Sequence, residues 1–193
     1  MQFHLGYTSV HRPGGRNYFP LTRAVYCGGV TAAFDSAYFR SVLGHVPTSV
    51  VVVTGVDNAG KPFGITIGSF ASVSLDPPLV GFFPGLQSRS WASIRESGRF
   101  AVNVLGGAQD ELCWRFAKEG DDKFDGVEYT LSSGGSPVLP GVIALIDCSI
   151  ESESQAGDHS FVVGRVEALE HVDDATDAMI FFRGKVNSVV YKG

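Results

Sequence analysis

The sequence predicts a mainly β fold, a closed antiparallel barrel with a few short helices, and three observations carry this prediction. Short runs rich in Val, Ile and Phe recur at intervals of about 8–12 residues, which is typical of β-sandwiches and barrels. The chain has 24 glycines and nine prolines, which favour tight turns over long helices. With 193 residues, of which 44% are hydrophobic and 18% charged, the chain can bury one sizeable core and is not generally disordered.

The amino-terminal part differs from the rest because it shows neither the period of a strand nor that of a helix. We interpret residues 1–33 as a loosely held extension and residues 34–193 as the single domain. A start codon placed too early, or an arm that docks on a partner subunit, would explain the extension equally well. The sequence alone does not choose among these.

The elements of the domain follow from apolar periodicity and from the turn residues between them. The β-branched run at 49–54 is apolar on both faces and therefore predicts a buried strand. In the next segment apolar and small polar residues alternate, which predicts a strand with one core face. Helices are expected over residues 34–43, 88–95 and 109–116, and strands over 49–54, 63–68, 69–75, 79–83, 100–105, 143–150 and 160–169.

Charge and cysteine content exclude several classes of partner and setting. The chain carries 20 acidic and 15 basic side chains, so its formal charge of -5 disfavours nucleic acid and anionic membrane surfaces. No apolar run approaches the roughly 20 residues of a membrane-spanning helix, and no secretory signal is visible. The three cysteines, Cys27, Cys113 and Cys148, form no C-x-x-C pair, so we expect a reducing cytoplasmic setting and no metal site.

Two nucleotide-binding motifs are excluded. The segment from Gly55 to Lys61 matches the first seven positions of a P-loop, but the eighth position is Pro62 instead of the Ser or Thr that would bind magnesium. A hairpin turn is the better interpretation. No G-x-G-x-x-G occurs, so a Rossmann domain has no support.

The first candidate site is Ser88-Arg89-Ser90 at a predicted helix start. Free backbone N–H groups, two hydroxyls and a guanidinium favour an anion such as a phosphate at this place. A well-capped surface helix with an ordinary arginine is the alternative.

The second candidate is the small polar face of the strand at 63–68. Gly64, Thr66 and Gly68 form this face, and Ser69, Ser72 and Ser74 continue it. Small side chains let a flat aromatic ring approach the backbone, and nearby hydroxyls and amides can bind its polar edge. Strict alternation points Ser69 away from Thr66, so their joint use needs a bulge near Gly68. A solvent-facing strand surface is the alternative.

Two further candidates lie late in the chain. His159 follows Gly157 and Asp158 in a predicted turn, where it can stack on, hydrogen-bond to or electrostatically assist a ligand, or simply be solvated. The segment 181–185, with Arg183 at its centre, is either part of a site or an edge strand protected by charges.

Together and in this order, these segments resemble the short-chain flavin reductase family. These FMN-binding split-barrel proteins are the reductase components of two-component flavin-dependent monooxygenases. The similarity runs from about residue 34 to the end. The strings that carry it are FRSVLG at 39–44, PFGIT at 62–66, SFASVSLDPPLV at 69–80, SRSW at 88–91, RFAVNVL at 99–105, DKF at 122–124, GDH at 157–159 and FRG at 182–184.

The resemblance implies a Greek-key-like split barrel of six strands, a homodimer, and a flavin, FMN or FAD, in a groove near the subunit interface. It places Gly68 and Ser69 at the isoalloxazine edge, Phe83 and Pro84 beside the ring, and Ser88, Arg89 and Ser90 on the ribityl phosphate. It places Phe63, Gly64, Thr66, Arg183 and the catalytic residue His159 on the nicotinamide side. Val186 stands where relatives often have an aromatic residue, which is a departure from the family pattern.

The implied reaction is hydride transfer from NADH or NADPH to flavin, followed by delivery of reduced flavin to a partner monooxygenase. In such a reaction the protein mainly positions the two cofactors. A non-catalytic flavin carrier and an oxidase of the pyridoxamine-phosphate type are the alternatives. The choices between FMN and FAD and between NADH and NADPH stay open.

Overall fold

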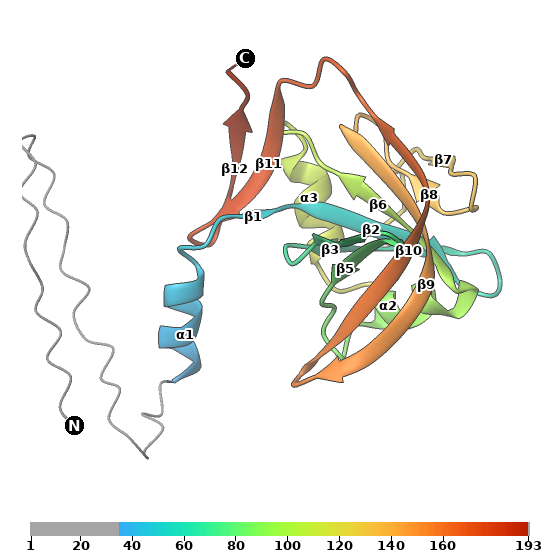
Figure 1. Ribbon diagram of the computed structural model, residues 1–193, viewed down its shortest axis with the longest axis horizontal. Coiled ribbons are helices and arrows are strands. Elements are labelled where there is room, and N and C mark those ends of the chain that lie inside the picture. Colours follow the sequence, from blue (N-terminus) through green and yellow to red (C-terminus); the bar gives the residue numbers. More distant parts are fainter. Residues whose placement is uncertain (1–34, 193) are drawn as a thin grey trace, which may run out of the picture. The chain divides into compact units, whose positions relative to one another are not determined.

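The computed structural model describes residues 35–192, so the predicted extension at 1–33 and Cys27 lie outside the described residues. Figure 1 shows a mainly β architecture with short helices, which confirms the predicted class. The helices are α1 (Ser36–Leu43), α2 (Arg89–Ile94) and α3 (Asp110–Ala117), and a 3-10 turn, η1 (Arg95–Ser97), follows α2. The strands are β1 (Thr48–Ser49), β2 (Val51–Val56), β3 (Pro62–Ile67), β4 (Ala71–Leu75), β5 (Pro78–Phe82), β6 (Arg99–Val104), β7 (Thr130–Leu131), β8 (Pro137–Val138), β9 (Ala144–Ala156), β10 (His159–His171), β11 (Asp177–Phe182) and β12 (Lys185–Val190).

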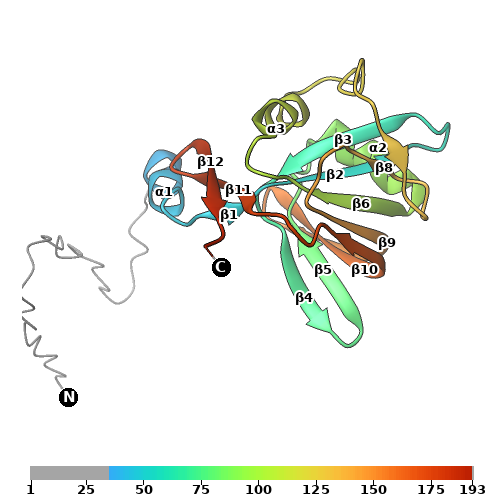
Figure 2. The same ribbon diagram turned by 90° about the horizontal axis from the view of Figure 1, so that it is seen from above.

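The main sheet has seven antiparallel strands in the order β3-β2-β6-β9-β10-β5-β4. The expectation of a closed barrel is wrong in one respect, because the edge strands β3 and β4 do not pair with each other. The cause is local: β4 forms a hairpin with β5, with a register irregularity between Ser72 and Ser74, and so turns away from β3. The sheet therefore has one strand more than the six expected, and it is open along one line, as in a split barrel (Figure 2).

Both faces of β2 are buried, as its β-branched sequence predicts. Val51 and Val53 belong to a core cluster that includes Phe82, Trp91 and Phe100. Val52 belongs to a second cluster, which contains Cys113, Phe116, Leu139 and Met179. Two cores on opposite faces of one strand fix the position of α2 on one side and of α3 on the other.

The longest strands, β9 and β10, join through a turn shorter than expected. The predicted turn covers five residues, whereas only Gly157 and Asp158 separate the two strands. Gly157 has φ +66, a conformation that glycine adopts without strain. As a result His159 is the first residue of β10 and not a loop residue.

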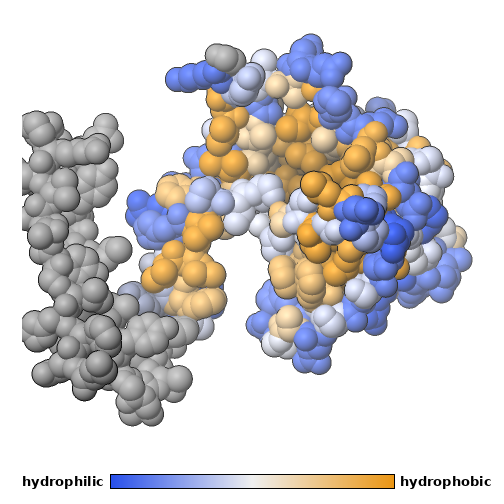
Figure 3. Space-filling view, in the orientation of Figure 1, coloured by the Kyte–Doolittle hydropathy of each residue, from blue (hydrophilic) through white to orange (hydrophobic). Residues whose placement is uncertain are grey.

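A separate three-stranded sheet has the order β1-β11-β12. The backbone N–H of Arg183, in the β11–β12 turn, donates to the carbonyl of Gly44 at 2.8 Å and so ties the hairpin to the end of α1. Figure 3 shows hydrophobic side chains over α1 and this sheet. The large exposed apolar residues there are Tyr38, Phe39, Val42, Leu43, Val46, Phe182, Val189, Val190 and Tyr191.

Candidate active site

A series of hydrogen bonds brings the end of β5 against the start of β10. The N–H of Phe83 donates to the hydroxyl of Ser69 at 3.0 Å. The N–H of Ser160 donates to the carbonyl of Pro84 at 2.9 Å, and Gly85 forms a β-bridge with His159. The structure therefore gathers four predicted site residues, Ser69, Phe83, Pro84 and His159, on adjacent backbone segments.

The same segment leads directly into the predicted phosphate site. The N–H of Ser88 donates to the carbonyl of Gly85 at 2.9 Å, and the Ser88 hydroxyl accepts from the N–H of Trp91 at 3.2 Å as the N-cap of α2. This capping was one of the two interpretations of the Ser-Arg-Ser motif. It leaves the N–H groups of Arg89 and Ser90 without an acceptor inside the helix.

A cavity of about 560 Å³ lies beside this turn. One wall comes from Gly85 and the Ser-Arg-Ser motif, and the opposite wall from the segment 117–120 and Lys123, which follow α3. The lining residues are Ile65, Gly85, Gln87, Ser88, Arg89, Ser90, Ala117, Lys118, Glu119, Gly120 and Lys123. The cavity is of the size that small-molecule sites in proteins have.

Lys123 is the residue that joins the walls of this cavity. Its ammonium donates to the carbonyls of Gly64 and Phe116, both at 3.1 Å, and to the hydroxyl of Ser90 at 3.0 Å. Burial lowers the pKa of Lys123, and the guanidinium of Arg89 lowers it further, against the opposing carboxylates of Asp121 and Glu119. Two cations at the same cavity therefore repel each other, and an anion bound in the cavity would offset this repulsion.

Arg89 itself is exposed and is held only loosely. Its guanidinium lies 3.4 Å from the carboxylate of Asp121, and both side chains are more than half exposed. A surface ion pair of this kind contributes little to stability. The guanidinium can therefore exchange Asp121 for a ligand anion at small cost.

The imidazole of His159 is half exposed and lies 2.7 Å from the carboxylate of Asp158, measured between Nδ1 and Oδ1. The hydrogen bond with His159 lowers the pKa of Asp158. When Nδ1 carries the proton that this carboxylate accepts, Nε2 is left free to accept a hydrogen bond. Nearby, the ring of Phe83 stacks on Phe161 at 4.9 Å and is 42% exposed, so one aromatic face lies at the surface beside His159.

The expectation of an open face of small residues on β3 is wrong for Gly64 and Thr66, because α3 covers them. A Cβ at Gly64 would lie 2.6 Å from the ring of Phe116, and the hydroxyl of Thr66 donates to the carbonyl of Cys113 at 2.7 Å. The Phe63 side chain is half-buried against the main core. Only Gly68, beyond the end of β3, is exposed beside Ser69.

Arg183 is not brought together with the other predicted residues within the chain. It has φ 51 in the β11–β12 turn, and its N–H donates to the carbonyl of Gly44. The turn between β11 and β12 lies away from α2 in both ribbon views (Figures 1 and 2). The departure at Val186 lies on the same hairpin, since Val186 pairs with Phe181.

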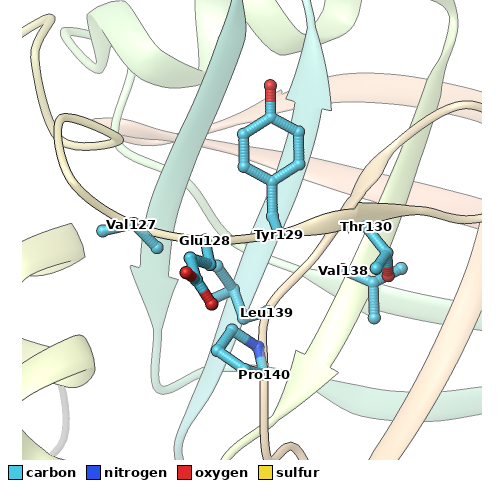
Figure 4. A pocket seen from close by; sticks show the side chains of 7 residues that line it. All are labelled: Val127, Glu128, Tyr129, Thr130, Val138, Leu139 and Pro140. Carbon is cyan, nitrogen blue, oxygen red and sulfur yellow. The ribbon is translucent and has the colours of Figure 1, made fainter.

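A second cavity of similar size, about 550 Å³, contains none of the predicted site residues. Figure 4 shows the segment 127–130 facing the segment 138–140 around it. Within residues 35–192, no group of three or more His, Cys, Asp or Glu side chains could hold a metal ion. None of the helices in that range is long and apolar enough to span a membrane.

Two residues that contribute to the site are not predicted from residue types. Lys123 belongs to the string DKF, which contributes to the family resemblance, but a lone lysine in a Gly- and Asp-rich loop carries no periodic or motif signal of its own. Gly85 is not among the predicted site residues. Its signal is the string Phe-Phe-Pro-Gly, where a proline and a glycine end a strand just before the helix cap.

Comparison with known proteins decides the family. The model of the flavin reductase like domain matches residues 43–189, more than half of the chain. The chain belongs to this family. A flavin reductase of Pseudomonas putida is 48% identical over 155 residues, which cover 80% of this chain and 91% of the relative. The reductase subunit HsaB of a flavin-dependent monooxygenase from Rhodococcus jostii is 45% identical, with 84% and 83% covered.

Solved structures agree with this assignment. Component B of a nitrilotriacetate monooxygenase from Mycobacterium thermoresistibile superimposes with a TM-score of 0.76 at 41% identity, over 79% of this chain and 86% of that one. The NADH:FAD oxidoreductase SgcE6 of Streptomyces globisporus, in complex with NAD and FAD fragments, gives a TM-score of 0.76 at 32% identity, over 82% and 95%. The flavin reductase described here therefore shares its fold with reductases of two-component systems.

Proposed function

We propose that this NAD(P)H-dependent flavin reductase binds its flavin along the line from Ser69 to Ser90, with the flavin phosphate in the cavity between α2 and α3. The protein supplies reduced flavin to a partner monooxygenase. The observation that carries the proposed location is that two cationic side chains, Arg89 and Lys123, line the same cavity. Their mutual repulsion favours a dianionic phosphate there.

The residues present fit a flavin. The Arg89 guanidinium, the Ser90 hydroxyl and the free N–H groups of the first turn of α2 form a donor set suited to phosphate. The ammonium of Lys123, whose three N–H groups already donate within the protein, adds a positive charge. Next to it, the exposed ring of Phe83 offers a surface for an aromatic ligand. The chemistry that a bound flavin supplies is acceptance of a hydride from NAD(P)H.

The role proposed for His159 is to orient the nicotinamide. With Nδ1 held by Asp158, the imidazole has a fixed orientation and a free Nε2 at the rim of the site. Positioning of this kind, together with exclusion of water, is the main contribution that a protein makes when cofactors carry the chemistry. The nicotinamide-side roles of Phe63, Gly64 and Thr66 become indirect, since these residues hold α3 and the core in place.

We also propose that the functional unit is a homodimer and that Arg183 acts in the site of the partner subunit. Two facts support this: the hairpin of Arg183 belongs to a sheet separate from the one that carries β5 and β10, and exposed apolar side chains surround it. Exposed apolar surfaces of this extent mark protein interfaces. The two described cysteines are free and buried, which supports the expected cytoplasmic setting.

The test of the proposed location is anaerobic stopped-flow mixing of the protein with FMN and NADH, in the native protein and in Arg89→Ala. We expect the native protein to bleach flavin absorbance over many turnovers. In Arg89→Ala the Michaelis constant for FMN should be about tenfold higher than in the native protein, because a charge-assisted contact to phosphate is lost. An unchanged constant would remove Arg89 from the site. Absence of bleaching beyond that of free FMN mixed with NADH would indicate a non-catalytic carrier.

A further inference from the structure

A smaller cavity, of about 340 Å³, opens beside the proposed phosphate site. It is lined by Glu111, Trp114, Arg115, Lys118, Glu119, Asp122 and Lys123. Three of these residues, Lys118, Glu119 and Lys123, also line the phosphate cavity, so the two cavities are contiguous. A ligand whose phosphate lies between Arg89 and Lys123 can extend past Lys118 into the smaller one.

Trp114 forms an aromatic wall of this cavity. Cys113 and Phe116 point toward the core, so the outward face of α3 carries Glu111, Trp114, Arg115 and, beyond its end, Lys118 at helical spacing. The indole is 45% exposed and has no hydrogen-bond or ring partner within the described part of the chain. The other tryptophan, Trp91, is 3% exposed and donates to Glu153.

Lys118 is the free cation of the pair of cavities. Arg115 donates to the carbonyl of Asp125 at 2.8 Å, Arg89 faces Asp121, and Lys123 holds three protein acceptors. Lys118 has no ion pair or hydrogen bond of its side chain to any residue in 35–192. It stands where the two cavities meet.

We propose that the smaller cavity is the adenylate subsite of FAD, with the adenine stacked on Trp114 and the second phosphate held by Lys118. The proposal rests on the proposed location of the flavin phosphate. It makes FAD the preferred flavin, because FMN ends at the phosphate and leaves Trp114 and Lys118 without a ligand. The carboxylates of Glu119 and Asp122, on the same wall, suit the ribose hydroxyls and the adenine amino group as acceptors.

NADH also carries an adenylate group, but contiguity with the phosphate cavity favours FAD. The nicotinamide side is proposed at His159, on β10, whereas the adenylate cavity lies between α3 and the loop after it. A preference for NADH in the smaller cavity would therefore overturn the proposal.

The test is titration calorimetry of the full-length protein with FAD, with FMN and with the nonreducing NAD⁺. We expect the native protein to bind FAD more tightly than FMN. In Trp114→Ala the FAD dissociation constant rises about tenfold, as expected for loss of base stacking, while the FMN constant changes less than about twofold. Trp114→Phe keeps an aromatic face and restores most of the FAD affinity.

The contribution of charge is tested with Lys118→Gln. We expect the dissociation constant for FAD to rise about fivefold and that for FMN to remain unchanged. Lys192→Gln removes an equal charge elsewhere on the surface and leaves both constants unchanged. Equal effects of Trp114→Ala on FAD and FMN, or an effect on NAD⁺ alone, would overturn the adenylate subsite and leave the proposed function standing. Failure of the native protein to bind either flavin would instead refute the proposed phosphate site.

Discussion

The two ends of the proposed site differ in how they are built. The phosphate end is complete within one chain, because Lys123 joins β3, α2 and α3 through three hydrogen bonds. The end that carries Arg183 belongs to a separate sheet, tied to α1 and surrounded by exposed apolar side chains. In the proposed function, binding of the flavin phosphate therefore needs one chain only, whereas use of the nicotinamide needs Arg183 from a second copy.

The largest effect is expected from breaking the apolar surface of α1. In the double variant Tyr38→Glu/Val42→Glu, two charges replace exposed apolar residues that would be desolvated in a dimer. We expect a monomer in sedimentation analysis, with NADH-dependent flavin reduction lowered roughly a hundredfold, which corresponds to about 3 kcal/mol. Affinity for the flavin should persist. A dimeric and fully active variant would show that this surface is not the interface.

The next effect tests whether Gly64 serves packing or ligand binding. Gly64→Ala places a methyl group 2.6 Å from the ring of Phe116 and should lower the free energy of unfolding by about 2 kcal/mol in urea titration. Adding Phe116→Leu should restore part of the loss. If stability stayed unchanged while the Michaelis constant for NADH rose, Gly64 would face the ligand after all.

A smaller effect is expected at the rim of the site. In His159→Ala the Michaelis constants for NADH and NADPH should rise about fivefold, with little change in the flavin constant, because one hydrogen bond and one aromatic contact are lost. Asp158→Asn weakens the orientation of the imidazole and should have a smaller effect in the same direction. Normal nucleotide constants in both variants would remove His159 from its role.

The smallest effect concerns the two buried thiols. Burial, followed by the neighbouring Asp147, raises the pKa of Cys148 to about 12, and burial with Asp110 raises that of Cys113. In a Cys27→Ser background both thiols should resist alkylation at pH 8. They should do so even in the Tyr38→Glu/Val42→Glu variant, since both lie in the part that is complete within one chain.

The sign of the pH dependence follows from the raised pKa of Cys148. The unfolded thiol ionises above its ordinary pKa of 9.0, while the folded thiol stays protonated until about 12. Folding stability should therefore fall as the pH rises above about 9. Cys148→Ala should flatten this alkaline decline in urea titrations, and an equal slope in both proteins would contradict the assignment.

The sequence predicted the elements well where the local pattern was strong. The buried strand β2 and the Ser88 cap of α2 need only local chemistry, β-branched residues in one case and a hydroxyl in the other. The prediction of an open face on β3 is wrong because Phe116, which covers Gly64, lies about 50 residues further along the chain. The role of Lys123 is not predictable from its local sequence for the same reason, because its three hydrogen-bond acceptors lie on other segments of the chain.

Most of the site residues are predicted by the family resemblance, and fewer by residue chemistry alone. The motif at 88–90 indicates an anion from its residue types alone. For His159, the sequence alone leaves a solvated turn residue as the more ordinary outcome, and its β-bridge to Gly85 places it next to a residue that lines the cavity. Within residues 35–192, the side chain of Arg183 has no hydrogen bond or ion pair to another predicted site residue, so no pattern within the chain predicts its place.

The most direct measurement compares the affinities of riboflavin and FMN, which differ only in the phosphate, for the native protein and for Arg89→Ala. If the cavity between α2 and α3 binds the flavin phosphate, the native protein binds FMN at least about tenfold more tightly than riboflavin, and Arg89→Ala removes most of that difference. Equal affinities of the native protein for riboflavin and FMN would contradict the account.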